Sequence, residues 1–538
     1  MPDSAIPFSE LGFSSLFVDY LQRDEKLAPF FSVHPFDDAG VNRRIENFSF
    51  PGNRSAIVQL LTRFNSEFET TKTTLDQIKK LEDPDSLAIV TGQQLGVFGG
   101  PLFTIYKICT AIALAKKYST EQKRTVVPVF WLADEDHDFE ETHSLTVVDG
   151  DDTHSVSVPF AAADFLPAVG CAKLTGHIQD VKKKIRDVLP ETDFSEELWI
   201  LINHCYQPGY THRKAFGRLV LKLFGKHGLI LAGSNLKHIK EYTMPVLRQS
   251  VERQGEISDV LDAQTYQLIS DGYHGQVQVQ ESNLFRFRED GAREKITYDG
   301  SCWRADNHSF TTEELASDIE KQPERYSPNV FLRPLLQDTL LPTLMYVGGP
   351  GEIAYYAQMK PLYELMGMTM PIITPRVSLT LYESAIERIV EKLPFTISEY
   401  RQRIEDLEKQ FVERTETTDI EKLFGMWRHQ IQELSKEKEK AIREIDPSLG
   451  KTVGKASSTY FSELDKLKGK VYRSVKEQEE VQLNRIRKIK TNLFPEGSLQ
   501  EREIAFLTYM NKYGISIWDR LLDDLKEKKT TAHHLYRL

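Results

Sequence analysis

Cysteine is scarce in this chain of 538 residues, which contains only four. They stand far apart, at positions 109, 171, 205 and 302, and no two of them form a Cys-x-x-Cys pair. This spacing disfavours a zinc ribbon or a scaffold held by disulfides. Cys109 lies in a helix-like pattern, which is typical of a core residue. His204 and Cys205 are adjacent in sequence, but adjacency does not make a catalytic pair, so we expect no catalytic cysteine.

Long apolar runs are also missing, since no stretch approaches the roughly 18 residues of a membrane-spanning helix. The first residues lack the basic region and the apolar stretch of a secretion signal. Lys and Arg number 68 against 79 Asp and Glu, and this net charge of −11 disfavours binding to phosphate backbones. We therefore expect a cytoplasmic protein without a membrane or nucleic-acid partner.

What is present is an ordinary globular composition, with 40% hydrophobic and 27% charged residues. Residues 87–133 have the pattern of a βαβ unit. An apolar run at 87–91 breaks into a glycine-rich loop at 92–101, a helix pattern follows at 102–118, and a second apolar run covers 125–133. Further strand candidates lie at 153–158, 229–232, 276–280 and 371–374. This order predicts an α/β fold with a parallel sheet covered by helices.

The pattern changes near Tyr382. Apolar residues recur there at intervals of three and four with charges between them, over 397–411, 420–434 and 460–471. Pro447 and Gly450 interrupt the repeat, because proline stops a helix and glycine permits a turn. We interpret residues 383–495 as an antiparallel coiled-coil arm and residues 1–382 as a body, in which about 145–300 are inserted connecting segments. Residues 496–538 are predicted to be a helical segment that docks back on the body.

The glycine-rich loop is the first candidate site. It follows a strand and precedes a helix, whose free N–H groups and positive dipole end suit an anion. Its amide side chains can orient a polar ligand. The loop is not a Walker A motif and does not fit Gly-x-Gly-x-x-Gly, and a tight turn that merely needs glycine is the alternative. The candidate binding residues are Gly92, Gln93, Gln94, Gly96, Gly99 and Gly100.

An acidic segment, Asp-Glu-Asp-His-Asp at 134–138, follows the second predicted strand. Open parallel sheets bind ligands at the carboxyl ends of their strands. Asp134, Asp136 and His137 are therefore candidate catalytic residues, which could supply a base, grip an ammonium group or hold Mg²⁺. The His-Glu-x-x-His spacing is missing, so no dedicated metal site is expected, and a solvated acidic loop is the alternative.

Two later segments place polar residues among apolar ones. Asn329 and Arg333 are hard to bury without partners. Arg333 could pair with a carboxylate or phosphate of a ligand, and a buried structural salt bridge is an equally good interpretation. Gly348 and Gly349 open another predicted helix, where Glu352 favours contact with a substrate amine or hydroxyl over an anion.

Three sequence blocks resemble the bacillithiol-biosynthesis cysteine-adding enzyme family. They are AIVTGQQLGVFGGPLFTIYK at 88–107, PVFWLADEDHDFEE at 128–141 and SPNVFLRPLLQDTLLPTLMYVGGPGEIAYYAQ at 327–358, with TPR at 374–376 just after. The similarity covers the whole chain. The resemblance implies a Rossmann-like nucleotide-binding core with inserted connecting elements, a long helical coiled coil and a homodimer.

The resemblance also implies a reaction, the last step of bacillithiol formation, in which the carboxyl group of L-cysteine is joined to the amine of glucosaminyl malate. ATP is the expected source of activation, with Mg²⁺ as its companion ion. On this hypothesis the loop at 92–101 binds an anionic group, and Asp134, Asp136 and His137 engage the amine, the cysteine ammonium or Mg²⁺. Arg333 and Glu352 orient the sugar and malate groups. The amine must lose a proton, so a carboxylate or His137 is the expected base.

A weaker similarity links the core to class I aminoacyl-tRNA synthetases. Their His-x-Gly-His signature and their lysine-rich signal are both missing here, and Gly92-Gln-Gln stands near the place of the first. Such a likeness concerns the fold alone. Two alternatives to the ligase stay open: a nucleotidylyltransferase acting on another small molecule, and a non-catalytic dimeric coiled-coil scaffold.

Overall fold

The structure is a computed structural model that describes residues 5–159, 168–289, 291–305, 308–415, 419–525 and 528–538. The chain divides into two compact units. The first unit comprises 1–149, 153–380 and 500–536, and the second comprises 150–152, 381–499 and 537–538. None of the described helices is both long enough and apolar enough to cross a membrane.

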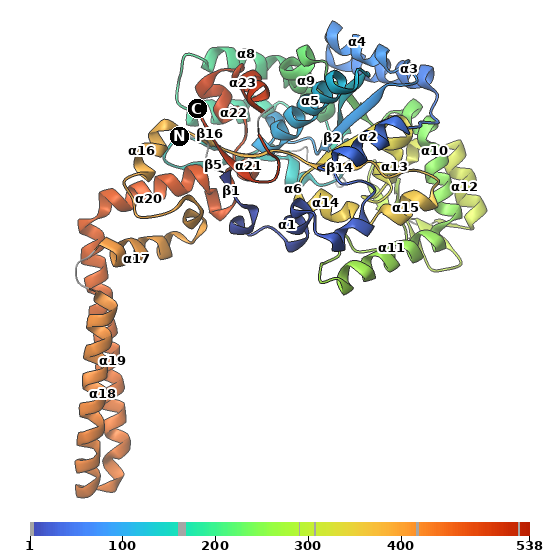
Figure 1. The fold of residues 1–538 in the computed structure, drawn as a ribbon. Helices are drawn as coiled ribbons and strands as arrows, with labels where there is room; N and C mark the ends of the chain where they lie inside the picture. The colour runs from blue at the N-terminus through green and yellow to red at the C-terminus, as the bar shows by residue number, and fades with distance from the viewer. Residues whose placement is uncertain (1–4, 160–167, 290, 306–307, 416–418, 526–527) are drawn as a thin grey trace. The chain divides into compact units, whose positions relative to one another are not determined.

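A five-stranded sheet forms the centre of the first unit (Figure 1). Its strands lie in the order β6 (Ile230–Gly233), β3 (Val126–Leu132), β2 (Leu87–Gln93), β13 (Thr343–Gly348) and β14 (Ile372–Pro375). Every neighbouring pair is parallel. In sequence order, β2 is the first strand of this sheet, and the later strands lie on both sides of it. This is the order of a doubly wound Rossmann-type sheet. The predicted α/β fold with a Rossmann-like core is confirmed.

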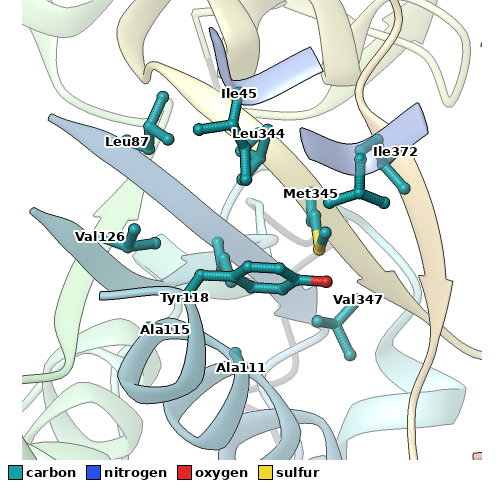
Figure 2. Packing of buried hydrophobic residues seen from close by; sticks show 12 residues of the cluster. Ile45, Leu87, Ala111, Ala115, Tyr118, Val126, Leu344, Met345, Val347 and Ile372 are labelled. Carbon is teal, nitrogen blue, oxygen red and sulfur yellow. The ribbon is translucent and has the colours of Figure 1, made fainter. Parts of the chain in front are cut away.

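Burial on both faces explains why the core strands are apolar almost throughout. All seven residues of β3 are buried, and so are the first six of β2. Helix α5 (Leu102–Gln122) connects these two strands, and its Ala111, Ala115 and Tyr118 pack in one cluster with strand residues such as Leu87 and Val347 (Figure 2). The predicted βαβ unit is therefore the first half of the sheet.

Most of the remaining helices of the first unit precede or connect the core strands. The chain begins with α1 (Ser15–Gln22), α2 (Asp38–Glu46), α3 (Arg54–Asn65) and α4 (Lys72–Lys80). The region of about 145–300 contains α7 (His177–Val188), α8 (Ser195–Cys205), α9 (His212–Phe224), α10 (Lys237–Glu252) and α11 (Gln254–Ser270). It also supplies β6, so this region is more than inserted connections. Further along lie α12 (Thr312–Lys321), α13 (Arg333–Leu340), α14 (Pro350–Tyr356) and α15 (Lys360–Leu365).

Small antiparallel sheets complete the first unit. Strands β4 (Ser144–Val148) and β5 (Thr153–Ser157) pair with each other. A second sheet has the order β12 (Tyr326–Pro328), β7 (Leu284–Phe287), β8 (Arg293–Lys295). A third has the order β11 (His308–Phe310), β10 (Trp303–Ala305), β9 (Thr297–Tyr298). Strand β5 confirms the strand predicted at 153–158.

Residues 276–280 do not form the predicted strand. The backbone N–H and C=O of Val277 both bond to the side-chain amide of Gln358, each at 2.9 Å. An amide side chain offers one acceptor and two donors, so it satisfies the groups that a neighbouring strand would otherwise pair. The stretch consequently runs as irregular backbone.

The C-terminal residues return to the first unit as α21 (Gln500–Glu503), α22 (Leu507–Tyr513), α23 (Ile517–Asp524) and β16 (His533–Arg537). Strand β16 lies between β1 (Ala5–Ile6) and β15 (Ser378–Tyr382). The expectation of helix over the whole of 496–538 is therefore wrong at its end, because residues 533–537 find strand partners on both sides.

The second unit is helical, with α16 (Ser384–Val390), α17 (Ile404–Thr415), α18 (Ile420–Ile445), α19 (Gly450–Gln478) and α20 (Glu480–Leu493). Helices α18 and α19 run side by side and are joined by a short turn at Pro447–Leu449 (Figure 1). The predicted antiparallel coiled coil is confirmed. Val412, Ile420, Phe424 and Leu464 form its buried cluster. Other residues of the predicted repeat are exposed: Trp427, Leu434, Tyr460 and Leu467.

Candidate functional site

Two adjoining cavities lie where the core strands end. The first cavity, of about 300 Å³, is lined by residues that follow β2 and β13. The second cavity, of about 460 Å³, is lined by residues that follow β3 and β6 and by 328–330. Both cavities share Gln94, Trp131, Ala133, Val277 and Arg333. Later strands flank β2 on both sides, and this switch point is where doubly wound sheets bind their ligands.

A buried ion pair forms one wall of the first cavity. Lys107 of α5 pairs with Glu352 of α14, and it also donates to the Gly92 carbonyl and to Gln93 Oε1, each at 2.9 Å. All three ammonium protons of Lys107 therefore have acceptors. Burial lowers the pKa of Lys107, and Glu352 opposes that effect in part.

Both carboxylate oxygens of Glu352 accept hydrogen bonds from the protein. Its Oε1 accepts a hydrogen bond from Tyr346 at 2.6 Å, and its Oε2 accepts one from the Gly349 N–H at 2.8 Å. Burial alone raises the pKa of Glu352, but Lys107 and these hydrogen bonds outweigh it and hold the pKa below its ordinary value. The structure thus places Glu352 on the cavity wall, where Lys107 already neutralises its charge.

Arg333 is the cation that the two cavities share. Within the described part of the chain, no carboxylate lies at ion-pair distance from its guanidinium. Burial lowers its pKa, but the polar groups Tyr355, Tyr346 and Asp136 outweigh this, so the pKa of Arg333 is raised above its ordinary value. Among the described residues Arg333 therefore has no structural salt bridge, and its guanidinium faces the cleft without a directly paired carboxylate.

The acidic segment after β3 separates into different environments. Asp136 reaches the second cavity, where it accepts hydrogen bonds from Gln94 Nε2 at 2.9 Å and the His137 backbone N–H at 2.8 Å. Arg293 Nη1 lies 3.9 Å from its Oδ1. The carboxylate of Asp136 is 30% exposed, so it is accessible to a ligand.

Asp134 and His137 do not share that access. The Asp134 carboxylate has no exposed surface and pairs with Arg213 at 3.3 Å. Burial raises the pKa of Asp134 to about 6, against the effect of Arg213. The ring of His137 lies against Phe287, at 5.9 Å between centroids, and lines neither cavity. Asp134 is thus one of the residues that line the second cavity, but its carboxylate is buried against Arg213, whereas His137 lies outside both cavities.

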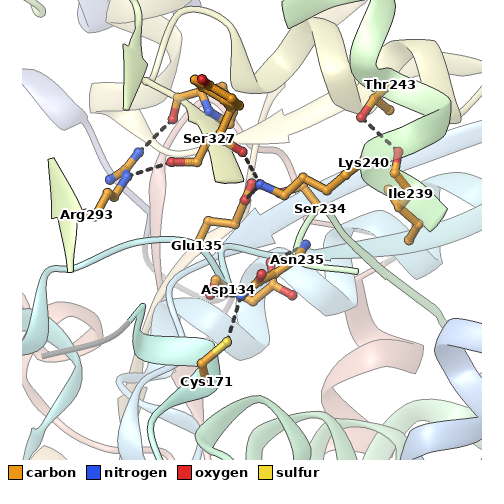
Figure 3. A network of polar contacts seen from close by, with 12 residues as sticks. Asp134, Glu135, Cys171, Ser234, Asn235, Ile239, Lys240, Thr243, Arg293 and Ser327 are labelled. Atoms are coloured by element: carbon orange, nitrogen blue, oxygen red, sulfur yellow. Dashed lines mark hydrogen bonds and ion pairs between the residues drawn. The ribbon is translucent and has the colours of Figure 1, made fainter. Parts of the chain in front are cut away.

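A polar network supports the floor of the second cavity (Figure 3). Glu135 forms a buried ion pair with Lys240 and accepts a hydrogen bond from Ser234. Arg293 donates to Ser327 Oγ at 2.9 Å and to the Pro328 carbonyl at 2.7 Å. The Glu135 contacts tie the end of β3 to α10 and to the end of β6, whereas the Arg293 bonds join β8 to β12.

The glycine-rich loop contributes only its first residues to the cleft. Gly92, Gln93 and Gln94 line the first cavity, whereas Gly96, Gly99 and Gly100 do not. A Cβ at Gly99, where φ is +97°, would lie 2.0 Å from the ring of Phe506, and one at Gly96 would lie 2.7 Å from Gly100 Cα.

The start of α5 is also closed to an anion. The Leu102 N–H, which begins the helix, donates to the Ile504 carbonyl at 3.0 Å. The predicted anion site over the whole loop is therefore not supported beyond Gln94. The turn interpretation accounts for Gly96, Gly99 and Gly100, because their missing side chains permit close packing.

Asn329 and the Gly348–Gly349 pair have different surroundings. Asn329 lines the second cavity, but its Oδ1 accepts the N–H groups of Phe331 and Leu332 at 2.9 and 3.1 Å. Gly349 lines the first cavity, whereas Gly348 only continues the strand ladder through its carbonyl. Asn329 thus shapes the entry to α13, which begins at Arg333.

Sequence reasoning missed most of the polar wall of the first cavity: Lys107, Trp131, Gln337, Tyr346, Arg376 and Arg502. Two of its buried atoms, Trp131 Nε1 and Gln94 Oε1, have no hydrogen-bond partner among the described residues. Buried polar groups are rarely left unpaired, so these atoms point to a polar ligand. The sequence signal that could have pointed to this wall is Lys107, a lysine in the middle of an otherwise apolar helix.

Among the described residues, no group of three or more His, Cys, Asp or Glu side chains converges in a way that could hold a metal ion. An oxygen-ligated ion bound mainly through the phosphates of a nucleotide needs only one or two carboxylates. Asp136 is exposed in the second cavity and fits that more modest requirement.

Two family models match the chain from end to end. Residues 1–377 match "Bacillithiol biosynthesis BshC, N-terminal Rossmann-like domain", and residues 379–538 match the C-terminal coiled-coil domain of the same family. Similar curated proteins include the "Putative cysteine ligase BshC" of Salinibacter ruber, 34% identical over 98% of this chain and 97% of its own. Those of Chlorobaculum tepidum (34% identical; 98% and 97%) and Bacillus cereus strain AH187 (28%; 94% and 95%) are also similar over nearly their whole lengths.

Proposed function

Because the chain belongs to the BshC family of bacillithiol biosynthesis, we propose that it is the ligase that joins L-cysteine to glucosaminyl malate. The new bond is an amide between the cysteine carboxyl carbon and the sugar amine. ATP supplies the activation of that carboxyl group. The reaction would take place in the cytoplasm, where ATP and free cysteine are available.

The observation that carries this proposal is the charge arrangement of the cleft. Arg333, without a carboxylate partner in the described chain, lies between the cavities, and Asp136 is exposed in the second. Glucosaminyl malate has carboxylates for a guanidinium to bind and an amine for a carboxylate to receive. Both groups stand at the switch point of the sheet, where nucleotide-binding folds hold their ligands.

The proposed chemical role of each residue follows from its access to a ligand in the cleft. The amine attacks the activated carboxyl carbon of cysteine, the C–N bond forms, and the activating group leaves with the electron pair of its C–O bond. Asp136 is placed to accept the proton that the amine loses, since it is exposed and oriented by Gln94. Arg333 binds the malate carboxylates or a phosphate, and Lys107 holds Glu352 and Gln93 in position. ATP, when bound, supplies only the leaving group.

The test is reconstitution with purified full-length protein. L-cysteine, glucosaminyl malate and ATP with Mg²⁺ are mixed, and bacillithiol is measured by thiol labelling and mass spectrometry. We expect product only when all three substrates are present. Release of pyrophosphate or of phosphate then tells whether ATP is split to AMP or to ADP.

The alternatives predict other outcomes. Pyrophosphate release with a different small acid, and no bacillithiol, would favour the nucleotidylyltransferase. Deleting the gene in a bacillithiol-producing host should abolish bacillithiol and raise glucosaminyl malate. Normal bacillithiol without that build-up would contradict the ligase, and a scaffold would show no ligand-dependent chemistry in the purified protein.

A further inference from the structure

Arg376 follows β14, lines the first cavity and is only 5% exposed. Its two terminal nitrogens are both held by Glu501 of α21, Nη1 at 2.9 Å and Nη2 at 2.7 Å. Nη1 also donates to the Val377 carbonyl at 2.9 Å. A bidentate pair of this kind fixes the plane of the guanidinium as well as its position.

The third nitrogen of the Arg376 guanidinium has no such partner. Its Nε is buried and makes no hydrogen bond within the described chain. A Cβ built on Gly349 would lie 3.7 Å from this Nε, so the Nε–H is beside the glycine that opens α14 and lines the first cavity. A buried, charged donor without an acceptor is costly, which suggests that a ligand supplies the acceptor.

Glu501 is itself rigidly held. It accepts hydrogen bonds from Ser378 Oγ at 2.9 Å and from the Leu379 N–H at 3.1 Å. Ser378 Oγ also contacts His533 Nδ1 at 2.8 Å, and His533 Nε2 lies 2.8 Å from Thr380 Oγ1. Burial raises the pKa of Glu501, but Arg376 outweighs it, so the carboxylate stays charged.

We propose that Glu501 is a positioning residue, which clamps Arg376 so that its Nε–H donates to an acceptor oxygen of the substrate in the first cavity. The assignment rests on the proposed function, in which that substrate is glucosaminyl malate, with carboxylate and hydroxyl oxygens as acceptors. Glu501 does not touch the substrate. It acts only through Arg376, and this distinguishes it from the residues that line the cavity.

The test is a double-mutant cycle on full-length protein with Arg376→Met, Glu501→Gln and both changes together. Binding of glucosaminyl malate is measured by calorimetry, and KM and kcat are measured in the ligase assay. A lost hydrogen bond to a charged donor corresponds to roughly 10- to 100-fold in affinity. We expect Glu501→Gln to weaken binding and raise KM about tenfold with kcat nearly unchanged. The double variant should bind no more weakly than Arg376→Met.

Glu408→Gln is the matched control, because Glu408 is a 7% exposed carboxylate that pairs with Lys476 and Arg487 within the second unit. It should lower the unfolding temperature without moving KM. If Glu501→Gln binds glucosaminyl malate as tightly as the wild type, or if the two effects add in the double variant, the role assigned to Glu501 is overturned. The proposed function would stand in either case. Failure of the wild-type protein to bind glucosaminyl malate would overturn the proposed function as well. Thermal unfolding of every variant separates lost folding from lost positioning.

Discussion

Asp136 is the side chain on which the proposed chemistry depends most directly. Asp136→Asn keeps the size of the side chain and one acceptor oxygen, for either the Gln94 amide or the His137 N–H, but removes the proton acceptor. General-base catalysis is worth about 100- to 10,000-fold, so we expect kcat to fall at least about 100-fold. The fold should persist, since the carboxylate is 30% exposed and makes no close ion pair.

Asp138→Asn is the matched control for that measurement. Asp138 is an exposed neighbour whose Oδ1 caps the Glu141 N–H at 3.0 Å, and asparagine caps a helix nearly as well. It should leave kcat unchanged. Full activity of Asp136→Asn would remove this residue from the reaction.

His533 gives the stability of the protein a defined pH dependence. Burial lowers its pKa to about 4, with Glu501 opposing the shift. An unfolded histidine titrates near pH 6.5, so between about pH 6.5 and 4 the unfolded chain binds a proton that the native chain excludes. The free energy of unfolding therefore falls as the pH drops through that window, and the full contribution is present above it.

His533→Gln should flatten this part of the curve, because an amide keeps contacts with Ser378 and Thr380 but does not titrate. The difference between about pH 7 and pH 4 should shrink by roughly 3 kcal/mol relative to the wild type. Urea unfolding at several pH values measures it. An unchanged slope in the variant would mean that the native pKa of His533 is not lowered.

At the scale of single residues, the sequence predicted some of the side chains that line the cleft and missed others. Gln93 ends β2, and Gln94 and Asp136 lie shortly after core strands, so the strand ends predict their place. Lys107 and Arg376 could not be found in that way. Lys107 needs Glu352 and Arg376 needs Glu501, and these pairs join residues more than a hundred positions apart, which only the tertiary fold brings together.

At the scale of elements, the glycine-rich loop packs closely against the C-terminal segment, and this packing can be tested by a single substitution. Gly99→Ala would place a methyl group 2.0 Å from the ring of Phe506, at a φ of +97° that alanine adopts poorly. Overpacking and backbone strain together should cost about 2–4 kcal/mol of unfolding free energy, measured by denaturant titration.

Gly255→Ala provides the comparison. Gly255 lies in α11 with open space where its Cβ would be, so alanine there should stabilise the protein by up to about 1 kcal/mol. A loss at Gly99 no larger than a few tenths of a kcal/mol would show that the loop and Phe506 separate readily.

Elements were predictable where their own periodicity determines them. The apolar runs of β2 and β3 and the heptads of α18 and α19 are local signals, and the structure contains all four elements. The stretch 276–280 and strand β16 depend on remote partners instead. Gln358 replaces a strand beside Val277, and β1 and β15 provide the two edges for β16. No local pattern carries that information.

At the scale of the whole molecule, we propose that the protein is a homodimer formed through α18 and α19. Trp427 is 39% exposed and Leu434 and Tyr460 are each 55% exposed, although all three belong to the predicted heptad repeat. An apolar stripe wider than a two-helix seam is typical of an interaction surface.

Trp427→Glu combined with Leu434→Glu should therefore halve the mass measured by light scattering after size-exclusion chromatography. Lys436→Glu, at an exposed charged position of the same helix, should leave the mass unchanged. A monomeric wild type, or a double variant that keeps its dimer mass, would contradict this interface.

The position of β16 between β1 and β15 also sets the order in which a newly made chain can mature. All five core strands lie before residue 376 and the hairpin of α18 and α19 comes next, so Glu501 and β16 are synthesised after both. Until then, Ala5 and Ile6 lack their partners and Arg376 lacks its counter-charge. Until residues 500–537 are made, the nascent protein thus has an unpaired strand and an unfinished site, and exposed strand edges of this kind favour aggregation.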